Sequence, residues 1–104
     1  MGSKIKEEAI RNLIRIEAPD ILLLQETKME EPEFLQVSKK LWKNSDASAV
    51  AARGASGGLG ALWNGNIFSL VEKASNSHWD MLKMQHVTTK EILCLFNVYV
   101  PVNA

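Results

Sequence analysis

The stretch Pro19-Asp20-Ile21-Leu22-Leu23-Leu24-Gln25-Glu26-Thr27-Lys28 decides the fold of this chain. The apolar run from Ile21 to Leu24 is short enough for a strand, and it contains no polar residue that would mark a face in contact with water. It therefore predicts a strand covered on both faces, as in layered α/β folds. Polar residues follow at once from Gln25, so the strand is expected to end there.

The segment before this strand has the pattern of an amphipathic helix. Between Lys4 and Ala18 the apolar residues recur at three-to-five-residue intervals, so they share one face of a helix. Pro19 disfavours the helical conformation of the residue before it, which predicts a helix that ends there. The segment Glu31 to Trp42 carries apolar residues among Lys and Glu, which predicts a second amphipathic helix. Pro32 is tolerated in its first turn.

Beyond Asn44 the chain has the pattern of short strands separated by turns. The apolar runs are Ala47–Ala52, Leu59–Trp63, Ile67–Lys73, Trp79–Val87 and Ile92–Val100. Turn-forming or polar residues separate them at Asn64–Asn66, Ala74–Ser77 and Thr88–Lys90, which predicts hairpins. A helix, a strand and a helix followed by a β-meander predict an α/β or α+β fold, with two helices packed on a mainly antiparallel or mixed sheet.

The composition is that of an ordinary globular domain or part of one. The chain has 104 residues, of which 46% are hydrophobic and 23% are charged. Its 12 Lys and Arg residues balance its 12 Asp and Glu residues. This balance excludes a broad basic field, so any nucleic-acid partner would need a local site.

Cysteine usage and hydropathy bear on the compartment of the protein. Cys94, the single cysteine, lies in an apolar run, so we expect a small core residue and exclude an internal disulfide. No stretch of the sequence has the pattern of a signal peptide or a membrane span. We expect an intracellular protein, cytoplasmic or nuclear, with no membrane partner.

Glu26 is the residue best placed for chemistry by its position alone. It follows the predicted strand directly, where layered α/β folds place groups that contact ligands. Alternation along the strand puts its side chain on the face of Leu22 and Leu24. A carboxylate there could hold a hard cation. The alternative is a solvated acid or the cap of a following turn.

Three segments together resemble one known family. Leu24–Lys28 is similar to a strand that ends in Leu-Gln-Glu-Thr-Lys, Ser56–Asn64 to a Ser-Gly-Gly strand opening, and Phe96–Asn103 to an Asn-Val-Tyr-x-Pro strand end. In this order and spacing the chain resembles the endonuclease/exonuclease/phosphatase (DNase-I-like) superfamily, in the style of LINE-type retrotransposon endonucleases. The resemblance implies part of a four-layered α/β sandwich and a Mg²⁺-dependent phosphodiesterase or endonuclease.

The resemblance also implies roles for individual residues. Glu26 matches a ligand of the catalytic Mg²⁺ or Mn²⁺, and Tyr99 matches the active-site tyrosine that hydrogen-bonds near the scissile phosphate. Asn103 matches a phosphate contact, although Val102 separates it from Pro101 in this sequence. Without the resemblance, Tyr99 is interpreted as a residue at the edge of the core. DNA is the expected partner of the intact family, and the nucleic-acid-binding residues stay unknown at this stage.

Several family segments are missing from residues 1–104. The family's first strand, which ends in an Asn beside the metal, would precede residue 1, and neither Gly-Asp-Phe-Asn nor Ser-Asp-His occurs. We expect the N-terminal half of the domain, with weak Mg²⁺ binding and little or no nuclease activity alone. The apolar run Ile92–Val100 also lacks a following cover, so marginal stability or self-association is expected.

Three hypotheses stay open at this point. The first is a truncated or degenerate part of a retrotransposon endonuclease. The second is half of an active nuclease that another chain completes. The third is a small interaction module that pairs through an exposed sheet edge.

Two further features invite a catalytic interpretation that the sequence does not favour. Arg53–Gly58 is rich in glycine, but no lysine follows the glycines and no helix begins there, so a tight turn into a strand is expected. His78 and His86 lie outside any Ser-Asp-His triplet. They are expected to be polar residues on a hairpin.

Overall fold

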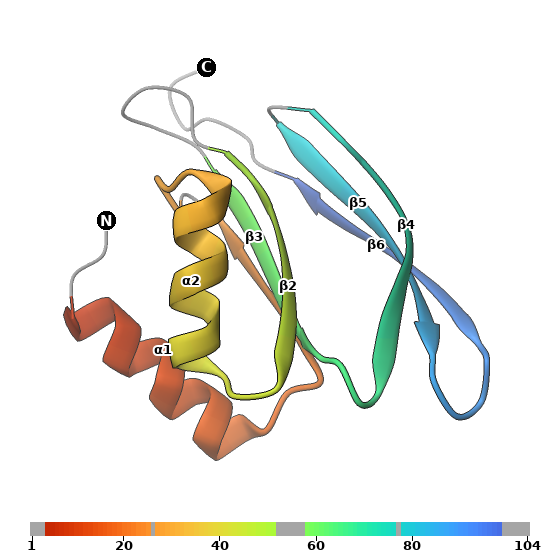
Figure 1. Ribbon diagram of the computed structural model, residues 1–104, viewed down its shortest axis with the longest axis horizontal. Helices are drawn as coiled ribbons and strands as arrows, with labels where there is room; N and C mark the ends of the chain where they lie inside the picture. The colour runs from red at the N-terminus through yellow and green to blue at the C-terminus, as the bar shows by residue number, and fades with distance from the viewer. Residues whose placement is uncertain (1–3, 26, 52–57, 77, 99–104) are drawn as a thin grey trace.

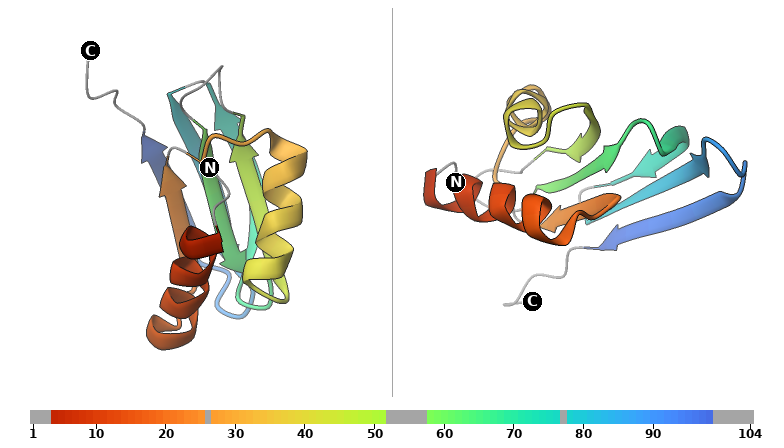
Figure 2. Two further views of the ribbon diagram at one scale, coloured as in Figure 1. Left: turned by 90° about the vertical axis from the view of Figure 1, so that its left-hand side faces the viewer. Right: turned by 90° about the horizontal axis from the view of Figure 1, so that it is seen from below.

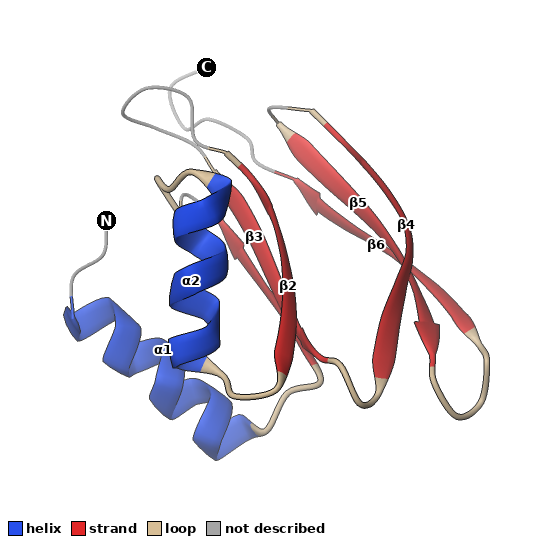
Figure 3. Ribbon diagram, viewed as in Figure 1, coloured by secondary structure: helices blue, strands red, loops and turns tan. Residues whose placement is uncertain are grey.

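The residues that the structure describes form two helices and two antiparallel β-sheets (Figures 1 and 3). The structure is a computed structural model that describes residues 4–25, 27–51, 58–76 and 78–98. The helices are α1 (Lys4–Glu17) and α2 (Glu31–Leu41). The strands are β1 (Ile21–Gln25), β2 (Ser45–Val50), β3 (Leu59–Asn64), β4 (Phe68–Ser75), β5 (Trp79–His86) and β6 (Ile92–Val98). In the described residues, no helix is both long and apolar enough to cross a membrane.

The elements are stacked in layers, as in part of an α/β sandwich. The first sheet has the strand order β1-β3-β2 and the second has the order β4-β5-β6. Both helices lie on one side of the first sheet, and the second sheet lies on its other side (Figure 2). The predicted α+β class with two helices on an antiparallel sheet is confirmed.

Strand β3 is the centre of the structure because its two faces supply two separate cores. Leu62 faces the helices and joins a cluster with Met29, Phe34 and Ala49. The alternate residues Ala61 and Trp63 face the second sheet, where they join Leu82 and Met84 in a second cluster. All members of both clusters are buried. A strand with apolar side chains on both faces therefore holds three layers together.

The predicted burial of the strand at Ile21–Leu24 is only partly correct. Its strand extends to Gln25 and pairs with β3 alone in the described residues. Leu22 and Leu24 pack against the helix-side cluster, whereas Leu23 is 36% exposed. The fully covered strand is β3 instead, because it has a neighbour on each side and a layer on each face.

The hairpin predicted at Asn64–Asn66 is wrong, although a tight turn does form there. The Ile67 amide donates to the Asn64 carbonyl over 3.0 Å, and the Asn66 amide donates to the Asn64 side chain over 2.9 Å. Strand β3 is already paired on both sides by β1 and β2, so β4 has no free edge of β3 to join. The turn therefore carries the chain from the first sheet to the second. The strands expected to form a single meander thus form two sheets.

The expectation that Cys94 is a core residue is also wrong. Cys94 is exposed, and it stands opposite Lys83 on the face of the second sheet that is turned away from the first. The inner face of the same strand carries Leu95 and Asn97, of which Asn97 is buried. An apolar run does not indicate which of its faces is covered, and in the described residues no layer lies over the outer face of the second sheet.

Candidate functional site

The predicted site residues follow the ends of two strands that lie side by side. Glu26, Tyr99 and Asn103 themselves are outside the described residues. In the sequence, Glu26 comes directly after β1 and Tyr99 directly after β6. The two strands run alongside each other with their arrowheads at the same end of the sandwich (Figure 2, left). The described part of the site is thus the pair of strand ends.

A hydrogen-bond network joins these two strand ends across the sheets. The side-chain amide of Asn97 donates to the carbonyls of Leu24, at 3.1 Å, and of Gly60, at 3.3 Å. Its Oδ1 accepts a bond of 3.3 Å from Nε2 of Gln25, which also donates to the carbonyl of Val98. Asn97 is 4% exposed, and a buried amide without partners would destabilise the fold. These hydrogen bonds satisfy it.

Asp80 lies beside this network and has no hydrogen-bond partner. It is opposite Asn97 in the β5–β6 register, it is fully buried, and both carboxylate oxygens are unpaired. Burial raises the pKa of the Asp80 carboxyl; the positive charge of Lys73 acts in the opposite direction, and the negative charge of Glu31 adds to the rise. An isolated buried carboxylate is costly, so this group favours its neutral form.

Lys73 forms a second polar connection between the sheets, on the side of β4 and β2. Its Nζ donates to Oγ of Ser48 and, over 3.1 Å, to the carbonyl of Ala49. The ammonium thereby reaches hydrogen-bond acceptors on the first sheet from the second. Its interaction with Asp80 is one of charge, because no hydrogen bond joins the two side chains.

The described residues do not by themselves form a metal centre. Among them no group of three or more His, Cys, Asp or Glu side chains could hold a metal ion. Thr27, next to Glu26 in the sequence, has a buried hydroxyl without a hydrogen-bond partner. An oxygen donor of this kind suits Mg²⁺, which binds few protein oxygens and keeps several waters. The donor set at the end of β1 is therefore compatible with a weakly held hard cation.

The histidines have the positions that the sequence predicted. His78 is exposed just before β5, and His86 ends β5 at the turn into β6. Nδ1 of His86 accepts bonds of 3.2 Å from the amides of Thr88 and Thr89, and its ring meets Phe68 edge-on. His86 is thus a hairpin residue. The loop predicted at Arg53–Gly58 lies outside the described residues except for Gly58.

Sequence reasoning did not assign a role to Gln25, Asp80 or Asn97. The signal for two of them was a polar residue inside an otherwise apolar strand. Asp80 interrupts the run that begins at Trp79, and Asn97 interrupts the run of β6. A polar residue within an apolar strand commonly faces solvent, so its presence alone does not predict a buried polar group. It does so only when the other face of the strand is known to be the exposed one.

The arrangement of the described elements is similar to that of a solved catalytic domain. The structure of the human Nocturnin catalytic domain with a bound sulfate anion matches at a TM-score of 0.68 and 15% sequence identity. That domain has the endonuclease/exonuclease/phosphatase fold, and the likeness is one of fold. The match covers 90% of this chain and 42% of the Nocturnin chain, so this chain spans less than half of its structural neighbour. No family model and no curated protein matches the sequence.

Proposed function

We propose that this chain is part of a nuclease-type phosphodiesterase domain of the endonuclease/exonuclease/phosphatase superfamily, derived from a LINE-type retrotransposon. The observation that carries the proposal is the joining of the ends of β1 and β6 by Gln25 and Asn97. These are the strands whose continuations, Glu26 and Tyr99, match the family's metal ligand and active-site tyrosine. The fold likeness to Nocturnin supports the same assignment.

In this proposal Glu26 holds Mg²⁺ or Mn²⁺, and the cation supplies neutralisation of charge on the phosphate and the leaving oxygen. Tyr99 donates a hydrogen bond to a phosphate oxygen, and Asn103 contacts the same group. DNA is the proposed substrate. The 104-residue sequence has no Gly-Asp-Phe-Asn or Ser-Asp-His segment to activate water. We therefore propose little or no hydrolysis by this chain alone, because the groups of such a site act as a unit.

The test is cation binding rather than hydrolysis. Mn²⁺ is expected to bind weakly and to broaden NMR signals around the end of β1, and Glu26→Gln is expected to abolish this binding with little change in stability. An amide is nearly the same shape as a carboxylate but carries no charge, and hard dications discriminate strongly between the two. Glu33→Gln is the matched control, because Glu33 is an exposed glutamate of α2. Broadening that survives Glu26→Gln would refute the metal assignment.

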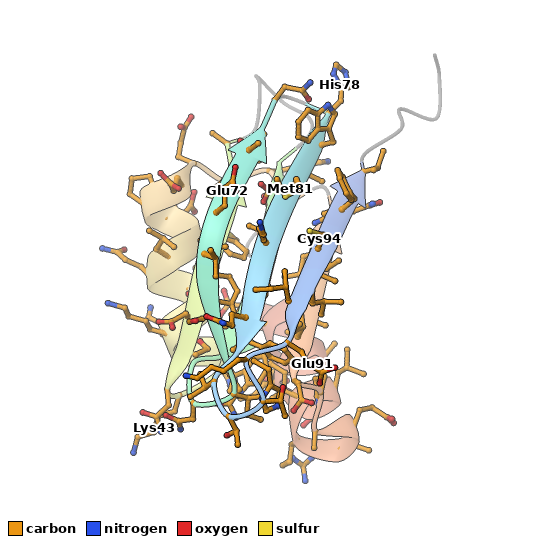
Figure 4. The ribbon with its side chains drawn as sticks, turned by 90° about the vertical axis from the view of Figure 1, so that its right-hand side faces the viewer. Lys43, Glu72, His78, Met81, Glu91 and Cys94 are labelled. Atoms are coloured by element: carbon orange, nitrogen blue, oxygen red, sulfur yellow. The ribbon has the colours of Figure 1, made fainter. Side chains whose placement is uncertain are left out.

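A second candidate function is an interaction module that pairs through a sheet edge. Within the described residues β6 pairs only with β5, and it leaves Ile92 51%, Phe96 63% and Val98 48% exposed. The outer face of this sheet, where Met81 and Cys94 lie, has no covering layer in the described part of the chain (Figure 4). An open edge with apolar side chains is a surface for strand addition.

This candidate predicts self-association that depends on β6. Phe96→Glu is expected to shift the chain toward monomer in sedimentation equilibrium, because a charge on the open edge opposes burial of that edge against a second copy. Val71→Glu is the matched control, since Val71 is 52% exposed but lies on β4, at the opposite edge of the sheet. An unaltered chain that is monomeric at all concentrations tested would exclude this function as self-pairing.

A further inference from the structure

Among the described residues, two polar connections join the sheets, and they lie on opposite sides of the sandwich. One joins β4 to β2 through Lys73, which contacts Ser48 and Ala49. The other joins β6 to β1 through Asn97 and Gln25. Both include part-buried hydrogen bonds between residues far apart in the sequence. Only the second lies at the strand ends that continue into the proposed site.

Most hydrogen bonds of the Gln25–Asn97 connection end on backbone carbonyls. Asn97 uses both N–H donors and its oxygen, and the two donors end on the carbonyls of Leu24 and Gly60. Gln25 ends on the carbonyl of Val98. The connection therefore ties the last residues of β1 to β3 and to the last residue of β6. A side-chain amide whose N–H donors and oxygen are all hydrogen-bonded has little freedom to adopt another arrangement.

We propose that Gln25 and Asn97 are positioning residues that hold the ends of β1 and β6 in the relation that cation binding at Glu26 requires. This inference rests on the proposed function. Neither amide touches the cation in this proposal; both act through the backbone from which Glu26 continues. Removing a group that orients a metal ligand without binding the metal typically weakens metal affinity by about 10- to 100-fold.

The test compares three substitutions of similar shape in the full chain, with Mn²⁺ as the probe. Gln25→Met and Asn97→Leu remove the amides of one connection, and Lys73→Met removes the ammonium of the other. The first two are expected to weaken Mn²⁺ binding by about 10- to 100-fold, measured by titration of free Mn²⁺ by electron paramagnetic resonance. Lys73→Met is expected to leave the affinity unchanged, although it also removes a connection between the sheets.

Hydrogen exchange of backbone amides gives a second measurement that does not depend on the cation. Gln25→Met and Asn97→Leu are expected to accelerate exchange near the ends of β1 and β6, and Lys73→Met near β2 and β4. The double substitution at Gln25 and Asn97 is expected to weaken Mn²⁺ binding no more than the stronger single substitution, because the two amides form one network.

The outcomes separate failure of this inference from failure of the proposed function. If Glu26→Gln abolishes Mn²⁺ binding while Gln25→Met and Asn97→Leu bind as the unaltered chain does, the positioning role is wrong and the metal site stands. If Lys73→Met weakens binding as much as they do, the effect is one of general stability and the positioning role is likewise wrong. If the unaltered chain binds no Mn²⁺, or binds it independently of Glu26, the proposed function fails and the inference fails with it.

Discussion

Replacing Phe34 by alanine is expected to lower the free energy of unfolding by about 3–5 kcal/mol, the usual cost of removing a buried aromatic side chain. Phe34 is 2% exposed and stands in the helix-side cluster, where it joins α2 to the first sheet. A domain of this size has a total stability of about 5–15 kcal/mol. The substitution should therefore remove a large share of the total stability, measured as a lower midpoint of urea denaturation followed by circular dichroism.

The reason for this large effect is the close contact between Phe34 and Gly60. A Cβ atom placed on Gly60 would lie 2.3 Å from Cζ of the Phe34 ring, so the ring occupies the space that a side chain on β3 would need. Gly60→Ala is expected to cost about 1–3 kcal/mol through this overlap. Adding Phe34→Leu should restore part of the loss, because the two residues share one space and their effects do not add.

Phe96→Ala is the matched control for Phe34→Ala. It makes the same chemical change, but Phe96 is 63% exposed on the outer face of β6. Surface substitutions of this kind usually change stability by less than about 0.5 kcal/mol. A loss of similar size in both variants would contradict the assignment of Phe34 as a core residue that joins α2 to the first sheet.

The sequence predicts the elements of this fold well because each carries a local signal. The apolar stripe of α1 together with Pro19 predicts a helix that ends at Pro19. The helix ends at Glu17, two residues earlier, and Ala18 has left the helical region with φ 47°. The strands lie where apolar runs alternate with turns. Amphipathic periodicity and proline restrictions act within a few residues, so no knowledge of distant contacts is needed.

The assignment of strands to sheets could not be predicted in this way. Asn64–Asn66 has the composition of a hairpin turn, yet it connects two sheets because β3 has no free edge. Cys94 has the surroundings of a core residue, yet it faces outward. Both outcomes depend on which partners a strand finds, and a local pattern carries no information on that choice.

The candidate site also combines residues that the sequence could predict with contacts that it could not. Strand-end position singled out Glu26, and the resemblance gave roles to Glu26, Tyr99 and Asn103. These roles stay predictions because the three residues lie outside the described part of the chain. The inter-sheet network of Gln25 and Asn97 came from the structure alone, since these two residues are 72 positions apart in the sequence. Sequence patterns thus indicate the groups that could do chemistry, whereas contacts indicate what holds them in place.

Asp80→Asn is expected to stabilise the protein at neutral pH and to have little effect at low pH. A buried carboxyl whose pKa is raised on folding contributes stability below its unfolded pKa of about 3.8. That contribution is lost as the pH rises through the folded pKa, because the folded state must then either ionise in a buried place or hold a proton that the unfolded state releases. The amide carries no such charge, so the variant lacks this loss.

The expected gain at pH 7 comes from removing the charge alone, because the Asn amide would itself be a buried polar group without a partner at this position. It should be measured as the difference in unfolding free energy between the two proteins at several pH values from 3 to 7, and it should grow with pH. Asp20→Asn makes the same change at an exposed position and should show no comparable trend.

Stability curves for Asp80→Asn and the unaltered chain that run parallel over this range would mean that the Asp80 carboxylate has a compensating partner in the folded protein. Lys73 is the candidate, because its positive charge already opposes the rise in the pKa of Asp80. In that case Lys73→Met should restore the divergence between the curves.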